Sequence, residues 1–408
     1  MGRSVKGLAF SVAVSTTVMA GGYKIPEQSL NSMALGAAYV AHTTGADTAY
    51  FNPANMVFMG DKQYIESAIT LAHLSSNVYT LGGPASGKSK VENLLIPTMH
   101  YIAPALGNFR WGASLTVPGG LTKRWNTAYQ KAFAEEFTLK IIELNPSFAY
   151  KVAENFALGG GLRLIYSEGI VKSDSARGGR DMKGDTLEFG YNLALAYKPT
   201  ADMNFAVTYR SNVDLNEEGS ASLYGATRPN AKFYDGDASV EVPLPAALNI
   251  AISKTWEERL TLEFNYERTF WSTYETLDFK YTGTNNASIP KAFRSSAREW
   301  KDTNTFRIGA TVKMNNKFTA MMGFSIDETP SPIKNIGFEL PDSDAKIFTM
   351  GFRYQQSEDL SWGAAFLYDS KEAITIPRGI NENAVLTNGG GFSEGGAFLT
   401  TVGVAYEF

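Results

Sequence analysis

The chain has 408 residues, a formal net charge of −4 and no cysteine. The near-neutral charge gives no electrostatic support for a nucleic-acid partner, and the lack of cysteine excludes disulfides, thiolate chemistry and cysteine metal sites. A chain of this length could hold two or three ordinary domains, but its pattern indicates one large repetitive unit behind a short leader.

Residues 1–20 form a leader that differs from the rest of the chain. Arg3 and Lys6 precede an apolar run that is too short and too rich in Ser and Thr to span a bilayer. Val18 and Ala20 are small enough for a signal-peptidase site. We therefore expect a secretory signal peptide that is cleaved near Ala20. No cysteine follows the cleavage site, so the chain is not a lipoprotein.

Residues 21 to about 60 are apolar and rich in Ala and Gly, and they end at the turn Asn52-Pro53-Ala54. They are too apolar for a solvated tail and too few for an independent domain. Pro53 fixes its own φ and biases Asn52 towards an extended backbone. Such a segment has to bury its surface against the remainder of the chain.

From near Gln63 to the end, bulky apolar residues alternate with small or polar ones, which predicts β-strands between two environments. The pattern is clearest at 187–197, 260–267, 306–314 and 398–408. A soluble sandwich also alternates, but here the polar face combines Gly with charge and aromatic residues lie near strand ends. These are Tyr197, Tyr209, Tyr354, Tyr368 and Tyr406. The pattern is typical of an outer-membrane β-barrel.

Short polar turns alternate with longer polar stretches, as expected for periplasmic turns and outer loops. The turns are expected at 104–108, 151–155, 198–203, 254–259, 314–317 and 355–360, and the loops at 75–90, 119–136, 169–183, 213–237, 283–299, 329–343 and 377–395. Residues 260–282 lack turn-forming residues, so we expect one strand bent near Trp271-Ser272. The prediction is an all-β transmembrane antiparallel barrel of about 14 strands with both ends in the periplasm.

A barrel of about 14 strands is too wide to be filled by its own wall side chains. We therefore expect residues 21–60 to form an N-terminal hatch that plugs the lumen, and residues 61–408 to form the barrel. The aromatic residues Tyr406 and Phe408 at the chain end resemble the assembly signal of outer-membrane barrels, which implies the barrel-assembly machinery as a partner.

Four segments carry a resemblance to a known family: the start of the mature chain through "FNPANM", "LPAALNIAIS" at 244–253, "DETPSPI" at 327–333 and "LPDSDAKIFTMGFRY" at 340–354. In this order they resemble the FadL-type outer-membrane transporters of long-chain fatty acids and other hydrophobic compounds. The resemblance implies a monomer in the outer membrane of a Gram-negative bacterium, with no cofactor. Its other partners would be the hydrophobic ligand and membrane lipid.

The resemblance also implies a passive route. Ligand is captured among the outer loops, moves to an apolar pocket above the hatch, and leaves sideways through a gap at a kinked third strand. Lateral exit keeps a hydrophobic molecule out of water, where it would lose about 25 cal/mol for each Å² of exposed apolar surface. Fatty acids are the expected ligands, and aromatic or aliphatic hydrocarbons are the alternative. Asn52-Pro53-Ala54 is expected to hold the hatch against the gap, or merely to link plug and wall.

Pro97 and Gly112 are candidates for the lateral gate. Pro97 lies inside the predicted second strand and Gly112 inside the third. Proline cannot donate to a sheet ladder and usually marks a bulge or an unpaired edge. The alternative is a harmless bulge near the barrel rim.

Parity places four charges in the lumen: Arg163, Glu188, Glu263 and Arg307. A fatty carboxylate would need a cation there, but buried charges usually pair, and here they could pair across adjacent strands or with the hatch. Arg163 with Glu188, and Glu263 with Arg307, lie on adjacent predicted strands.

An outer loop offers three further ligand candidates, Lys123, Arg124 and Trp125, which could make a capture surface that is both cationic and apolar. A solvated loop is the alternative. A short helix is expected near 128–136.

Two other functions are alternatives to transport of a hydrophobic ligand. A barrel phospholipase or protease needs a histidine beside a serine and a third polar group, and none of His42, His73 and His100 lies in a recognisable motif. A general diffusion porin would lack the predicted plug, and single-channel conductance would distinguish it. No metal-ligand cluster or phosphate-binding loop is evident, so no cofactor is expected.

Overall fold

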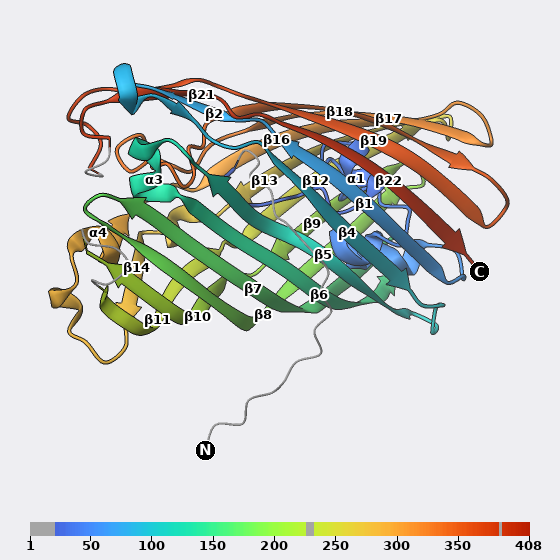
Figure 1. The fold of residues 1–408 in the computed structure, drawn as a ribbon. Coiled ribbons are helices and arrows are strands. Elements are labelled where there is room, and N and C mark those ends of the chain that lie inside the picture. The colour runs from blue at the N-terminus through green and yellow to red at the C-terminus, as the bar shows by residue number, and fades with distance from the viewer. Residues whose placement is uncertain (1–20, 226–231, 383–385) are drawn as a thin grey trace.

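The computed structural model describes residues 21–225, 232–382 and 386–408, so the predicted signal peptide lies outside the described residues. The chain forms a closed antiparallel barrel of 14 strands (Figure 1). Closure occurs at β1 (Tyr64–Leu74), which pairs with β4 (Glu92–Ile102) on one side and with the last strand, β22 (Ala397–Glu407), on the other. The predicted fold class is confirmed.

The other wall strands follow in chain order. They are β5 (Phe109–Arg124), β6 (Glu136–Ala153), β7 (Phe156–Ser175), β8 (Gly178–Thr200), β9 (Met203–Arg210), β10 (Val213–Tyr224), β11 (Lys232–Leu244), β12 (Ala247–Trp256), β13 (Leu260–Thr269), β14 (Thr276–Tyr281), β15 (Ser295–Ala297), β16 (Thr303–Lys313), β17 (Phe318–Asp327), β18 (Ala345–Gln355) and β19 (Leu360–Lys371).

Four wall positions are each shared by two strands that continue one another: β9 with β10, β12 with β11, β13 with β14, and β16 with β15. The expected bend near Trp271-Ser272 is confirmed by a short 3-10 helix, η3 (Trp271–Thr273), between β13 and β14. Two expected loops are corrected. Residues 169–183 and 213–237 are largely strand, because β7 and β8, and β10 and β11, continue beyond the apolar belt as paired hairpins with polar faces.

The outer loops carry a small second sheet of β2 (Asn77–Thr80), β3 (Gly87–Lys88), β20 (Ile374–Ile376) and β21 (Gly390–Glu394). They also carry η2 (Gly83–Ala85), α3 (Ala128–Ala134), η4 (Asn286–Ser288) and α4 (Lys291–Arg294). The helix α3 is the one expected near 128–136. Figure 1 shows these elements gathered at the barrel end opposite the C-terminus.

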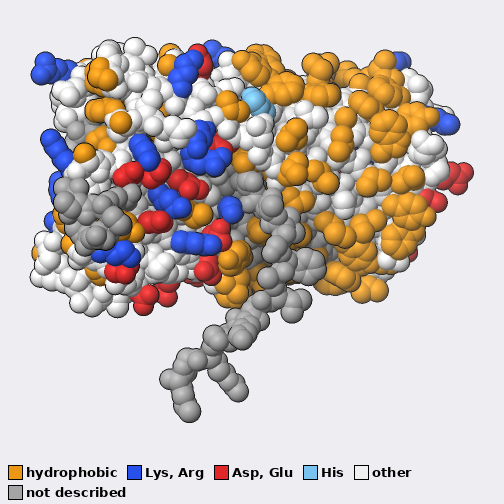
Figure 2. Space-filling view, viewed as in Figure 1, with side chains coloured by type: hydrophobic (Ala, Val, Ile, Leu, Met, Phe, Trp, Pro, Cys, Tyr) orange, Lys and Arg blue, Asp and Glu red, His pale blue; other side chains and the backbone are white. Residues whose placement is uncertain are grey.

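The outer surface shows a broad apolar belt towards the end of the barrel that holds the short turns, whereas charged residues gather near the outer loops (Figure 2). The belt includes half-exposed or more exposed side chains such as Phe148, Phe189, Leu193, Met322, Phe348 and Met350. Most of their wall neighbours point inward and are small or polar, as the period-two pattern predicts. Met321 and Ile347 also point inward but are apolar, and they belong to a cluster with Leu30 and Met33 of the N-terminal segment. The belt matches the hydrocarbon core of a membrane.

No helix among the described residues is long and apolar enough to cross a membrane.

The N-terminal segment, residues 21–60, lies inside the ring of strands and is almost entirely buried. It contains α1 (Leu30–Ala34), α2 (Thr48–Phe51) and η1 (Pro53–Phe58). Of these elements, α1 packs on β17, β18, β19 and β22, α2 on β4 to β6, and η1 on β5 to β8. Ser29 begins α1 with a capping box to Ser32. Contacts on several sides hold the segment across the lumen.

The first and last wall strands meet at the rim that holds the short turns. The Gln63 N–H donates to the Phe408 carbonyl at 2.8 Å, and the Phe408 N–H donates to the Gln63 carbonyl at 3.1 Å. Tyr406 and Phe408 lie in ring contact at 5.5 Å. The final residue therefore takes part in the seam that closes the barrel.

Candidate functional site

The wall is interrupted between β4 and β5. These strands pair only where Met99–Ile102 meets Gly112–Leu115. Beyond this point the β4 edge has no β5 partner, although the strands approach again where the Lys90 N–H donates to the Arg124 carbonyl at 2.8 Å. We call the interval, with Glu92–Thr98 on one edge and β5 from Thr116 on the other, the wall gap. Pro97 lies on its β4 edge.

The β5 edge of the wall gap is kinked. The register with β6 shifts between Thr116 and Gly119, which leaves Val117 and Pro118 out of the ladder. Pro118 has no N–H to donate, so a regular ladder cannot pass through it. The proline in "LTVPGG" is the sequence signal that could have located the kink and was missed.

Residues 23–25 of the N-terminal segment pair with the kinked strand from inside the barrel. The Gly120 N–H donates to the Tyr23 carbonyl at 2.8 Å, and the Ile25 N–H donates to the Pro118 carbonyl at 2.9 Å. Lys24 forms a bridge with Gly119. A piece of the N-terminal segment thus replaces β4 as the partner of β5.

Gln28 completes this replacement with its side chain. Its Nε2 donates to the Val117 carbonyl, and its Oε1 accepts from the Val117 N–H, both at 2.8 Å. The side-chain amide therefore bonds Val117 as a neighbouring peptide would. His100 of β4 lies 2.9 Å through Nε2 from the Gln28 carbonyl. Because a carbonyl only accepts, Nε2 carries the proton, and the chain His100–Gln28–Val117 spans the gap.

His100 also lies beside a serine, with Nδ1 2.9 Å from the Ser114 Oγ. No local motif predicts this pair, because its residues meet only through strand pairing. A hydrolase would need a carboxylate or similar group to orient the ring, and here the second ring nitrogen bonds the Gln28 backbone. The geometry is that of a structural bridge.

Gly112 lies at the paired end of the gap, where the N-terminal segment packs most closely. A β-carbon at Gly112 would lie 2.9 Å from the Ala49 Cβ and 3.0 Å from the Met56 Sδ. The residue therefore allows the segment to approach the wall. It lies beside the opening, whereas Pro97 and Pro118 lie on its edges.

The turn Asn52-Pro53-Ala54 packs against the wall at β7 and β8. Ala54 packs on small residues of β7 and β8, and a β-carbon at Gly159 would lie 2.6 Å from the Ala54 nitrogen. Asn52 Nδ2 donates to the Val40 carbonyl at 3.0 Å. The turn thus ties the segment to itself and to the fifth and sixth wall strands.

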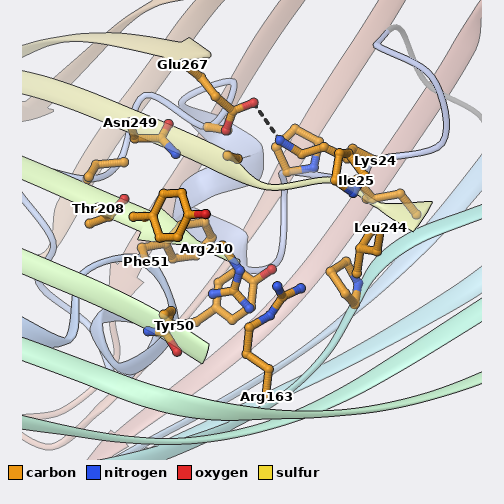
Figure 3. A pocket seen from close by; sticks show the side chains of 18 of the residues that line it. Lys24, Ile25, Tyr50, Phe51, Arg163, Thr208, Arg210, Leu244, Asn249 and Glu267 are labelled. Carbon is orange, nitrogen blue, oxygen red and sulfur yellow. Dashed lines mark hydrogen bonds and ion pairs between the residues drawn. The ribbon is translucent and has the colours of Figure 1, made fainter. Parts of the chain in front are cut away.

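An inner cavity lies between the N-terminal segment and the wall, with a volume of about 760 Å³ including its open mouth (Figure 3). Its charged lining residues are Lys24, Arg163, Arg210, Arg307 and Glu267. Pro118 also lines it, so the cavity reaches the kink of the wall gap.

The four cations that line the inner cavity form their ion pairs with only two carboxylates. Arg163 Nη2 pairs with Glu143 at 2.9 Å, and Arg210 binds the other oxygen of Glu143. Glu267 pairs with Lys24 at 2.8 Å, as the dashed line in Figure 3 marks, and with Arg307 at 3.3 Å. The lining and its partners therefore carry an excess of positive charge.

The expectation that lumen charges pair is met, but with other partners. Glu263 accepts the backbone N–H groups of Val40, Ala41 and His42 instead of binding Arg307. Glu188 bonds Thr186 rather than Arg163. For Glu263 the physical reason is that the N-terminal segment brings its own donors into the lumen.

An outer cavity of about 630 Å³ lies on the loop side of Tyr23. Its lining is largely apolar and includes Leu121, Phe137, Val171, Val242, Tyr274, Leu277, Phe279, Trp300 and Leu340. Arg298 reaches this cavity but is paired with Glu339. Such a site suits the hydrophobic part of a ligand.

Tyr23 stands between the two cavities, since it lines the outer one while Lys24 and Ile25 line the inner one. Its hydroxyl donates to the Pro243 carbonyl across the lumen. Burial raises the pKa of Tyr23 well above its ordinary value, so the hydroxyl remains a donor. Residues 23–25 therefore lie both at the boundary between the cavities and on the kinked strand of the wall gap.

The expected capture residues of the outer loops are each engaged within the protein. Lys123 is buried and donates to the Asn77 side chain, and Arg124 forms an ion pair with Glu92. Trp125 is buried in an aromatic cluster, where its Nε1 donates to the Phe338 carbonyl at 2.8 Å. These residues brace the loops over the barrel.

In the described part of the chain, no three His, Asp or Glu side chains are grouped closely enough to hold a metal ion.

Comparisons with known proteins place this geometry in context. A sequence model of the family described as "Outer membrane protein transport protein (OMPP1/FadL/TodX)" matches residues 11–408. The long-chain fatty acid transport protein of Escherichia coli K12 is 24% identical over 384 residues, covering 80% of this chain and 83% of its own length. Outer membrane protein P1 of Haemophilus influenzae is 23% identical, covering 74% and 76%.

Solved structures are similar in fold. A Pseudomonas aeruginosa FadL homologue superimposes with a TM-score of 0.79 at 19% identity, covering 95% of this chain and 99% of its own. The P. putida toluene transporter TodX superimposes with a TM-score of 0.73 at 18% identity, covering 93% and 98%.

Proposed function

The chain belongs to the OMPP1/FadL/TodX family of outer-membrane transport proteins, and from its cavities and wall gap we propose that it carries long-chain fatty acids into the membrane by lateral exit. Its coarser role is that of a FadL-type transporter of hydrophobic compounds in the outer membrane of a Gram-negative bacterium. The relatives are transport proteins, and no enzymatic role is proposed.

The proposed route uses the N-terminal segment as a hatch. Ligand enters the outer cavity from the loops, passes Tyr23 into the inner cavity, and leaves between β4 and β5. The largely apolar outer cavity keeps an acyl chain out of water, which is worth about 25 cal/mol for each Å² buried. Exit requires residues 23–25 and Gln28 to leave the kinked strand.

The choice of ligand rests on two neighbouring cavities. The inner cavity has more cations than carboxylates, and the outer cavity beside it is largely apolar. A long-chain fatty acid has one apolar chain and one carboxylate, so its two parts match the two cavities. Charge-assisted hydrogen bonds from arginine to a carboxylate are stronger than those between neutral groups. Arg210 is the best placed, because it is only partly buried and lies over the Tyr50 ring at 4.2 Å.

Arg210→Gln tests this assignment with two ligands of equal chain length, oleate and oleyl alcohol. We expect the affinity for oleate to fall about tenfold, since one charge-assisted contact is worth about 1.5–3 kcal/mol. Affinity for the alcohol should stay within about twofold. Arg259→Gln, an exposed arginine in a short turn, is the matched control. Equal losses for the acid and the alcohol would refute a carboxylate site.

A monoaromatic hydrocarbon is the second candidate, favoured by the rings of Tyr274, Phe279 and Trp300 in the outer cavity. A neutral hydrocarbon would need only this cavity and no cation. Toluene that displaces bound oleate from the wild type, and whose own binding is unaffected by Arg210→Gln, would support it. Failure of toluene to bind at all would exclude it.

A further inference from the structure

The first residue after the predicted cleavage site, Gly21, is buried inside the barrel against a carboxylate. A β-carbon at Gly21 would lie 2.8 Å from Asp327 Oδ2, and its φ of +79° is one that glycine adopts without strain. The next residue, Gly22, donates its N–H to Asp342 Oδ2 at 3.1 Å. Two residues without side chains thus bring the backbone up to two aspartates.

These aspartates belong to a cluster with more negative than positive charge. The charges of Asp342, Asp369 and Asp327 all act on one ammonium group, that of Lys371. Lys371 Nζ pairs with Asp342 Oδ1 at 2.5 Å. Asp327 accepts from the Thr305 hydroxyl at 2.6 Å. All four charged groups are buried, and buried carboxylates are stabilised by cations at hydrogen-bond distance.

Two other cations act on this cluster, and each has a partner elsewhere. Lys123 acts electrostatically on Lys371, and its Nζ donates to the Asn77 side chain. Arg307 acts electrostatically on Asp327, but its ion pair is with Glu267, which Lys24 shares. One more positive charge close to Asp327, where the Gly21 backbone lies, would therefore stabilise the cluster.

We propose that signal-peptide cleavage after Ala20 supplies this charge, and that the new α-ammonium of Gly21 pairs with Asp327 and Asp342. Hydrolysis of the Ala20–Gly21 bond consumes one water, leaving a carboxyl group on Ala20 and an amine on Gly21 that takes a proton at neutral pH. In the uncleaved chain the same nitrogen is an uncharged amide. Maturation thereby completes the site.

The consequence concerns the wall gap. Residues 23–25 pair with the kinked strand, and an ion pair at residue 21 would anchor their free end on the opposite side of the lumen, at β17. Cleavage at another bond would move the ammonium out of reach and weaken the closure of the gap. The inference rests on the cleavage site predicted from the sequence and is independent of which ligand is carried.

The test uses the protein purified from outer membranes after expression with its own signal peptide. Intact mass first establishes the mature end. The α-amine is then labelled with an amine-selective reagent across a pH series in three variants: Asp327→Asn, a Gly-Ser insertion between Ala20 and Gly21, and Asp359→Asn as an exposed control. Heat-modifiable migration verifies that each variant is folded.

We expect wild-type labelling at pH 7.5 to be about tenfold slower than in the inserted variant, with its midpoint raised by about one pH unit above the ordinary value near 8. Asp327→Asn should lower that midpoint, and Asp359→Asn should not. If burial alone slowed the labelling, the Asp327→Asn variant would label as slowly as the wild type and with the same midpoint. A midpoint unchanged by Asp327→Asn therefore overturns the proposal. A mature end other than Gly21 also overturns it.

Discussion

Replacing Gln28 by methionine should open the wall gap while leaving the barrel intact. Methionine has a similar length but cannot make the bonds of Gln28 to the Val117 N–H, the Val117 carbonyl and the Ile25 carbonyl, all at 2.8 Å. Each bond contributes about 0.5–1.5 kcal/mol net, and each backbone group left unpaired costs about 1–3 kcal/mol. The closed arrangement should lose about 2 kcal/mol or more.

Such a loss raises the population of the open gap about thirtyfold, since about 1.4 kcal/mol corresponds to a factor of ten. Hydrogen exchange in detergent measures it at the amides of Val117, Gly120 and Ile25. All three should exchange about thirtyfold faster, while amides in β17 to β19 keep the wild-type rate. If ligand leaves by the proposed lateral route, uptake of oleate should not fall, because the lost bonds hold the wall gap closed.

Gln130→Met is the matched control, because Gln130 is also fully buried and donates to a backbone carbonyl, but in the outer loops. Unchanged exchange at Val117 in Gln28→Met would refute the role of Gln28. An equal acceleration at Val117 in the control would show that the effect is general loosening of the protein.

Three further predictions concern other parts of the chain. Deletion of Phe408 removes its two hydrogen bonds to Gln63 and should lower the yield of heat-modifiable barrel, and a normal yield would contradict an assembly role. Ala54→Trp has no space against Gly159, so it should displace the segment at a cost of about 1–3 kcal/mol and raise single-channel conductance, whereas wild-type conductance would count against the packing. Burial raises the pKa of Glu27 from 4.5 to about 7. The folded state therefore binds the Glu27 proton more tightly than the unfolded state does. As a result, the stability of the folded N-terminal segment falls as the pH rises from 4.5 through 7. Conductance openings should be more frequent at pH 8 than at pH 5.5 in the wild type but not in Glu27→Gln.

The sequence by itself determined the architecture, because the period of two is a local property of each strand. Alternation along 187–197 or 398–408 requires no knowledge of the neighbouring strand to show which face meets lipid. The short turns fixed the order of the strands, and the apolar composition of residues 21–60 required that they be buried. The strand count, the bend near Trp271 and the resemblance to the transporter family all followed from such local patterns.

Only the tertiary structure decided which residues act together, since these contacts join distant parts of the chain. Gln28 meets Val117 across 89 positions, and Arg210 meets Glu143 across 67. Parity placed Arg163 in the lumen, but which carboxylate it pairs with depends on the stagger between strands. Likewise, Ala54 packs on small residues of β7 and β8, which only the fold brings to it. The wall gap is lined where the N-terminal segment takes the place of a missing strand pairing, and no local pattern encodes that substitution.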